Sequence, residues 1–151
     1  MQHLFNNKFI NVILLFLWMA FIFMMSHCDA EVSSSQSSTI VGLINNITNT
    51  SNLDILTTLV RKSAHFFEYL ILGILTINVI KDYVNINNYK KLIIFSIIVC
   101  IIYAVSDEVH QVYVPGRDGN VVDCLIDSFG SLSGILIYYL FYKKLINKQN
   151  N

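Results

Sequence analysis

Four long apolar segments constrain the fold of this 151-residue chain more than any other feature of its sequence. They run over approximately residues 9–26, 63–80, 91–107 and 122–142. A helix needs about 20 residues to cross a membrane, and the second and third segments reach this length only with their polar flanks. Because only helices and closed barrels satisfy their backbone groups in lipid, we predict an all-α integral membrane protein. The predicted fold is a bundle of four transmembrane helices in one domain over residues 1–151.

The composition agrees with a membrane protein and argues against two other classes. Hydrophobic residues make up 54% of the chain and charged residues 13%, whereas soluble domains carry about 25% charged residues. Ten basic and ten acidic residues cancel, so the basic surface typical of nucleic-acid binding is missing and we expect no nucleic-acid partner. The three cysteines form no C-x-x-C pair, which argues against a disulfide framework or a structural zinc site.

The first segment is expected to stay in the protein as a helix, because its apolar run is longer than the about 7–15 residues of a signal peptide. Residues 27–60 are predicted to form an extracellular loop. Within it, the run TIVGLINNI over residues 39–47 suits a short helix at the membrane surface. A further helix is predicted to start near Asn52, which is a suitable N-cap residue, and to continue into the second span.

The basic residues predict how the bundle is oriented. With the N-terminus in the cytoplasm, seven lysines lie at cytoplasmic positions and three basic residues lie outside. An excess of lysine and arginine marks the cytoplasmic side of membrane proteins. We therefore expect four spans with both termini in the cytoplasm.

Polar and charged residues gather at the outer ends of the last three spans. Charges near hydrocarbon are costly and usually serve a function. The set consists of Arg61, Lys62, His65, Glu68, Asp107, Glu108, His110, Gln111, Arg117, Asp123 and Asp127. Three helices with polar ends on the same side of the membrane predict a single polar site at the outer face.

The spacing places several of these side chains on shared helix faces. Arg61, His65 and Glu68 fall at positions i, i+4 and i+7, which lie on one face of a helix. Glu68 is therefore expected either to handle a proton or to pair with Arg61. A Gly-x-x-x-Gly pattern, which lets helices approach closely, continues the stripe on which Asp127 lies. The acid is thus predicted to point into the bundle and away from lipid.

Three interpretations of the set remain open. It can be a structural ion-pair network that neutralises charges within the bundle. It can bind a divalent metal, for which His65, His110 and Asp127 are the candidate ligands by residue type, although no H-E-x-x-H motif is present. It can also perform acid–base chemistry, with Glu68, His110 and Asp107 as the candidate catalytic residues.

The polar residues lie in three stretches that together resemble the VanZ-like family of small bacterial membrane proteins. The stretches are RKSAHFFEYLILG over residues 61–73, SDEVHQVYVPGR over 106–117 and DCLIDSFGSLSG over 123–134. Tyr69, the last residue of the R-K-x-x-H-x-x-E-Y motif, joins the predicted binding residues. The run LWMAFIFMMS is similar to the first span of the family. The ending MMSHCDAE departs from the serine-rich ending expected there, so Ser26 is not counted in the predicted site.

The resemblance implies a polytopic protein of the bacterial cell membrane. The namesake of the family is associated with resistance to the lipoglycopeptide teicoplanin. The resemblance implies no particular reaction, so whether the chain is an enzyme stays open.

Two hypotheses of function follow from these observations. In the first, Arg61, Lys62 and Arg117 hold the anionic part of an envelope lipid, a cell-wall precursor or the membrane-anchored antibiotic, without catalysis. In the alternative, the chain is a membrane enzyme that modifies a lipid-linked envelope substrate by histidine–carboxylate or metal chemistry. Membrane lipids are the expected partners in both cases, and the sequence does not determine the oligomeric state.

Overall fold

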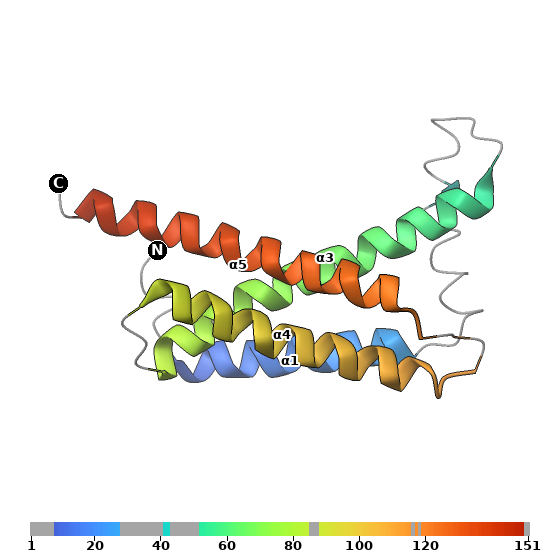
Figure 1. Cartoon of the computed structure of the whole chain (residues 1–151), viewed down its shortest axis with the longest axis horizontal. Helices are drawn as coiled ribbons and strands as arrows, with labels where there is room; N and C mark the ends of the chain where they lie inside the picture. Colours follow the sequence, from blue (N-terminus) through green and yellow to red (C-terminus); the bar gives the residue numbers. More distant parts are fainter. Residues whose placement is uncertain are drawn as a thin grey trace.

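The computed structural model of the chain is built from long helices. It describes residues 8–27, 41–42, 52–84, 88–115, 117 and 119–149, with side-chain burial described as far as residue 144. Within these ranges the long helices are α1 (Lys8–His27), α3 (Leu53–Tyr83), α4 (Tyr89–Gln111) and α5 (Val121–Gln149) (Figure 1). All four are long and apolar enough to cross a membrane. The prediction of an all-helical fold with four spans is confirmed.

Helices α3 and α5 cross at very short distance, because glycines replace side chains where they meet. A Cβ atom built on Gly134 would lie 2.0 Å from the backbone oxygen of Leu70, and one on Gly130 would lie 2.4 Å from that of Phe66. From the other helix, a Cβ atom on Gly73 would lie 2.2 Å from the backbone oxygen of Ser131. The Gly-x-x-x-Gly face of α5 is thus the face that packs on α3.

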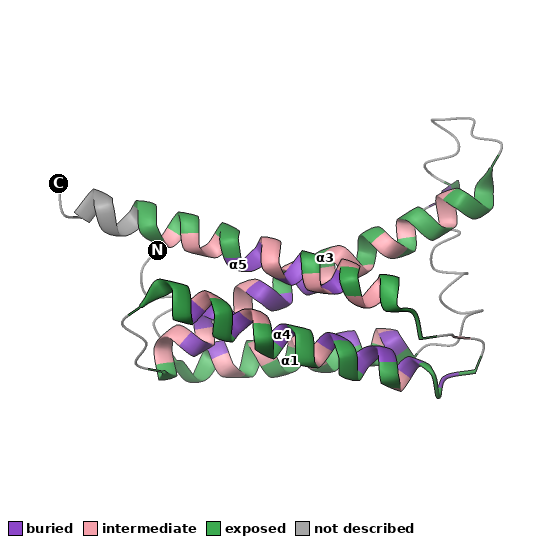
Figure 2. Cartoon of the chain, viewed as in Figure 1, coloured by how far each residue is buried: buried purple, intermediate pink, exposed green. Residues whose placement is uncertain are grey.

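Apolar side chains cover the outside of the bundle as well as its core. Figure 2 shows buried positions where the helices face one another and exposed positions along their outer faces. The exposed fractions of Phe16, Ile102, Phe129 and Phe141 lie between 63% and 67%. Such an apolar surface suits hydrocarbon and not water, because large exposed apolar patches are rare on soluble monomers.

A polar network joins the helices at the end where α1 begins and α5 ends. The Nζ atom of Lys81 donates to the hydroxyl of Tyr138 at 2.7 Å, and that hydroxyl donates to Oδ1 of Asn78, also at 2.7 Å. The amide of Asn11 on α1 donates to Oδ2 of Asp82 at 2.9 Å. These bonds tie α1, α3 and α5 together at this end.

Part of the predicted loop lies outside the described residues. Of residues 27–60, the structure describes His27, residues 41–42 and residues 52–60, and residues 53–60 form the beginning of α3. The predicted surface helix over residues 39–47 is described only at residues 41–42, which are helical. The predicted helix start near Asn52 agrees with the start of α3, but the side chain of Asn52 makes no capping hydrogen bond.

Candidate functional site

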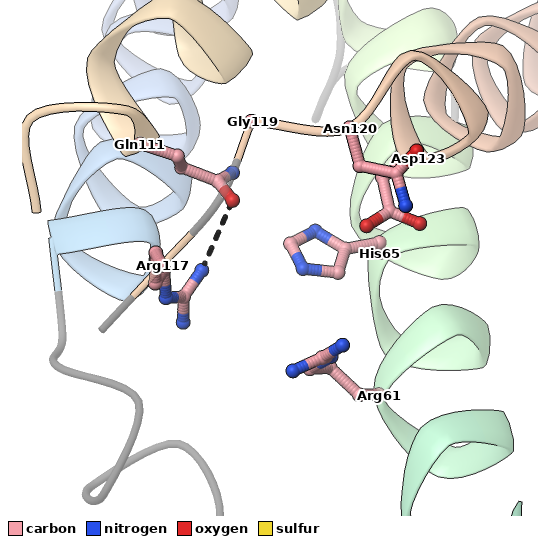
Figure 3. Close-up of a pocket in the computed structure, with 7 residues that line it drawn as sticks. All are labelled: Arg61, His65, Gln111, Arg117, Gly119, Asn120 and Asp123. Carbon is pink, nitrogen blue, oxygen red and sulfur yellow. Dashed lines mark hydrogen bonds between the residues drawn. The ribbon is translucent and has the colours of Figure 1, made fainter.

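A polar pocket with a volume of about 340 Å³ lies at the end of the bundle where α1 ends and α3 begins, which we call the pocket end. Its walls come from α3, the end of α4, the segment that joins α4 to α5, and the start of α5 (Figure 3). The lining residues are Arg61, His65, Gln111, Arg117, Gly119, Asn120 and Asp123. All of them except Gly119 and Asn120 belong to the set of residues expected from the sequence.

The segment between α4 and α5 is held in place by its own backbone and by one buried acid. The amide of Arg117 donates to the carbonyl of Val114 at 3.1 Å, which closes a tight turn after the end of α4. The Oε2 atom of Glu108 accepts a hydrogen bond from the amide of Asn120 at 2.8 Å. A Cβ atom on Gly119 would lie 3.0 Å from the carbonyl oxygen of Glu108, so the small residue lets the segment pass close to α4. This anchoring holds Arg117 at the wall of the pocket.

Two guanidinium groups line the pocket without a carboxylate partner. In the described part of the chain, no Asp or Glu forms an ion pair with Arg61 or Arg117. Arg117 donates instead to neutral oxygens, to Oε1 of Gln111 at 3.3 Å and to the carbonyl of Met25 at 3.4 Å. The charge of Asp123 is already balanced by an ion pair with Lys62. The guanidinium groups of Arg61 and Arg117 are therefore the two charged groups of the pocket lining that have no ion-pair partner among the described residues.

His65 and Glu68 meet one turn apart on α3. The Nδ1 atom of His65 lies 3.8 Å from Oε2 of Glu68 and is buried without a hydrogen-bond partner. The backbone carbonyl of Glu68 accepts a hydrogen bond from Nε1 of Trp18 at 2.9 Å, which joins this turn of α3 to α1. Pairing with Arg61, one of the two alternatives for Glu68, is not among the ion pairs of the described residues, because seven residues of helix separate the two by about 10 Å along the axis.

Several predicted acids lie inside the bundle. Asp107 is 3% exposed, and its Oδ2 atom accepts hydrogen bonds from Ser26 at 2.8 Å and from Nε2 of Gln111 at 3.1 Å. Asp127 is fully buried on α5, and neither of its carboxyl oxygens has a hydrogen-bond partner. The buried hydroxyl of Tyr69 also lacks one. Each unsatisfied buried polar group lowers the free energy of unfolding by about 1–3 kcal/mol. Burial of these side chains therefore destabilises the bundle.

The structure places His110 in a different environment from His65. Its Nε2 atom lies 3.2 Å from Nδ1 of His27 at the end of α1. Its ring stacks on Phe23, with the ring centroids 4.4 Å apart. His110 is not one of the residues that line the pocket.

The candidate metal ligands are not brought together. Among the described residues, no group of three His, Cys, Asp or Glu side chains is arranged to hold a metal ion. His65 lines the pocket, His110 stacks on α1, and Asp127 is buried on α5. The arrangement of these three side chains gives no support to a shared metal site.

The predicted residues thus divide into three groups: those that line the pocket, those that contact other side chains near it, and those buried among the helices. Those that line the pocket are Arg61, His65, Gln111, Arg117 and Asp123. Lys62 is paired with Asp123, Glu68 adjoins His65, and His110 contacts α1. Those buried among the helices are Tyr69, Asp107, Glu108 and Asp127.

Sequence reasoning missed residues that complete the site. Ser26 is fully buried and hydrogen-bonded to Asp107, and Asn120 lines the pocket. His27 contacts His110 although no motif links the two. The only signal in the sequence for Ser26 and His27 was their position at the end of the first span, beside the polar ends of the other three.

Comparison with known proteins gave one result. The chain matches the family model described as VanZ/LLP1 over residues 9–142, a range that includes most of each helix. No curated protein and no solved structure matches the chain.

Proposed function

The chain belongs to the VanZ/LLP1 family, and from this premise we propose that its polar pocket binds the anionic headgroup of an envelope lipid or of a lipid-linked cell-wall precursor. Binding takes place at the outer leaflet of the bacterial membrane. It contributes to resistance against lipoglycopeptides such as teicoplanin, the property associated with the namesake of the family. No catalytic step is needed for this function.

One observation carries the proposal: Arg61 and Arg117 line the same pocket, and neither forms an ion pair with a described carboxylate. Guanidinium groups bind phosphate and carboxylate through paired, charge-assisted hydrogen bonds. A volume of about 340 Å³ lies within the usual range for small-ligand sites, roughly 300–1,000 Å³. The pocket is therefore suited to a compact anion, and its place at the ends of apolar helices suits an anion carried by a lipid.

The expected orientation agrees with this proposal. The lysines at the opposite end of the bundle include Lys81, Lys90 and Lys91, as the positive-inside rule requires of a cytoplasmic end. The pocket end would then face the outside of the cell, where lipid-linked precursors and glycopeptide antibiotics are both present.

Binding of a lipid headgroup to the purified protein in nanodiscs tests the proposal. The protein is placed in nanodiscs of phosphatidylcholine, and binding of a fluorescent headgroup analogue to it is measured. The measurement is repeated in nanodiscs that also contain a small fraction of a prenyl diphosphate or of phosphatidic acid, which should compete with the analogue for the pocket. A hydrogen bond between charged groups contributes about 1.5–3 kcal/mol, so Arg61→Gln and Arg117→Gln should each weaken binding by about tenfold or more.

Lys91→Gln is the matched control, because it removes one exposed positive charge at the opposite end of the bundle. It should leave binding within twofold of the unchanged protein. If all three substitutions weaken binding equally, only the overall charge matters, and the pocket does not bind the headgroup. A strain that expresses Arg61→Gln should also lose its protection against teicoplanin.

A further inference from the structure

We propose that His65 is a catalytic base in this pocket and that it promotes hydrolysis of a lipid-linked diphosphate held by the two arginines. Glu68 is its positioning residue. The inference rests on the proposed binding of a phosphate-bearing headgroup, and it adds a reaction to that binding.

The two nitrogen atoms of the His65 ring have different surroundings. Its Nδ1 atom is buried and lies 3.8 Å from Oε2 of Glu68, which follows it by one turn of α3. The ring projects from α3 into the pocket, where the side chains of Arg61 and Arg117 also lie (Figure 3). The second nitrogen, Nε2, is not among the buried atoms that lack a partner. A carboxylate near Nδ1 and a ring that lines the pocket are features of a histidine base, whose hydrogen bonds often tighten only when the substrate is bound.

Glu68 is held in a way that suits a positioning residue. Its backbone carbonyl accepts the indole N–H of Trp18 at 2.9 Å, so the helix turn that carries it is fixed against α1. A proton on Nδ1 of His65 would face the carboxylate, which leaves the lone pair on Nε2 free to accept a proton. At 3.8 Å the carboxylate forms no hydrogen bond with Nδ1 in this structure, and a small movement of the two side chains on substrate binding would form the bond that selects this tautomer.

The reaction that these groups support can be written in full. A water molecule attacks the terminal phosphorus of the bound diphosphate and gives its proton to Nε2 of His65. The bond between this phosphorus and the bridging oxygen breaks, and the lipid monophosphate leaves with that electron pair. Inorganic phosphate is the second product, and the imidazolium returns its proton to solvent.

The rest of the pocket favours the same reaction. Hydrolysis of a diphosphate builds negative charge on the phosphoryl oxygens, and the guanidinium groups of Arg61 and Arg117 line the same pocket and can stabilise such charge. Gln111 already accepts a hydrogen bond from Arg117 at 3.3 Å, which orients that guanidinium. The pocket therefore combines two anion-binding groups with one base.

His110, the histidine expected to act as a base from sequence alone, is less suited to the role. Its Nε2 atom faces Nδ1 of His27 at 3.2 Å, and its ring is stacked on Phe23. A base must have a free lone pair beside the substrate, and of these two histidines of the polar set His65 is the one that lines the pocket.

The test measures phosphate release and binding separately on the same preparations. The purified full-length protein is placed in phosphatidylcholine vesicles that contain a prenyl diphosphate, and free inorganic pyrophosphate is offered in a parallel arm. A general base contributes about 10²–10⁴-fold to a rate. His65→Gln should therefore lower the rate of phosphate release by at least a hundredfold, with headgroup binding within threefold.

Glu68→Gln should lower kcat at least tenfold with little change in KM, and Glu68→Asp should recover part of the loss. A merely structural role would not give this separation of kcat from KM. The controls are Asp54→Asn and Lys91→Gln, which remove an exposed carboxylate and an exposed positive charge outside the pocket. Both should leave the rate within twofold.

Failure of this inference differs from failure of the proposed function. Binding without phosphate release, or release that His65→Gln leaves intact, would overturn the catalytic role and keep the headgroup site. Absence of both binding and release would overturn the proposed function itself. Equal hydrolysis of free pyrophosphate would overturn the assignment of a lipid substrate.

Discussion

Replacement of Gly134 by alanine should separate α3 from α5 and so damage the pocket from a distance. The Cβ atom of the new side chain would lie 2.0 Å from the backbone oxygen of Leu70, whereas ordinary contacts begin near 3.4 Å. The shortfall is 3.4 − 2.0 = 1.4 Å. Neither a Cβ atom nor a helix carbonyl can rotate away, so the helices themselves must move.

The size of the effect follows from this displacement. Overpacking of a well-packed core usually costs about 1–3 kcal/mol. A gap of about 0.5–1 Å already removes a quarter to a half of the dispersion energy of each contact. Since the same crossing depends on Gly73 and Gly130, we expect Gly134→Ala to reach the upper end, about 3 kcal/mol. Headgroup binding should weaken as well, because Arg61 lies on α3 and Asp123 on α5.

The measurement is reversible unfolding in mixed detergent micelles, followed by the headgroup-binding assay in nanodiscs. Gly42→Ala is the matched control, because Gly42 is exposed and no atom of the described residues outside its own neighbourhood lies within 4 Å of a Cβ atom built there. The control should change the free energy of unfolding by less than about 0.5 kcal/mol, as surface substitutions usually do. If Gly134→Ala is no more destabilising than this control, the close crossing of α3 and α5 is wrong.

Two further predictions concern the buried acids and the orientation. Ser26→Ala removes the hydroxyl that donates to Oδ2 of Asp107 at 2.8 Å, so the free energy of unfolding should fall by about 1–3 kcal/mol. The control Ser106→Ala, which removes a hydroxyl at an exposed position, should lower the free energy of unfolding much less. Equal decreases for the two variants would argue against a special role for Ser26. Single cysteines at Tyr113 and Tyr83, in a background without other cysteines, should report opposite sides of the membrane. An impermeant thiol reagent should label the first in intact cells and the second only after permeabilisation, and the reverse result would place the pocket in the cytoplasm.

The sequence by itself determined the class of the protein and the general position of its polar site. The length and hydropathy of a segment are local properties, and lipid accepts few backbone arrangements, so four apolar segments predict four spanning helices. The helical repeat gives the face on which each polar residue lies, and its position in the segment gives its depth in the membrane. The side on which Arg61, Asp107 and Asp123 gather therefore followed from spacing and from the alternation of the spans.

Only the tertiary structure decided which of these side chains meet. The sequence grouped Lys62 with the arginines, but the structure pairs it with Asp123 on α5. It also separates His110 from His65 and brings Ser26 to Asp107. Such contacts depend on how far each helix is rotated about its axis and on where it crosses its neighbours. Those two quantities are set by packing between helices, such as the close approach of α3 and α5, and the pattern of a single helix does not contain them.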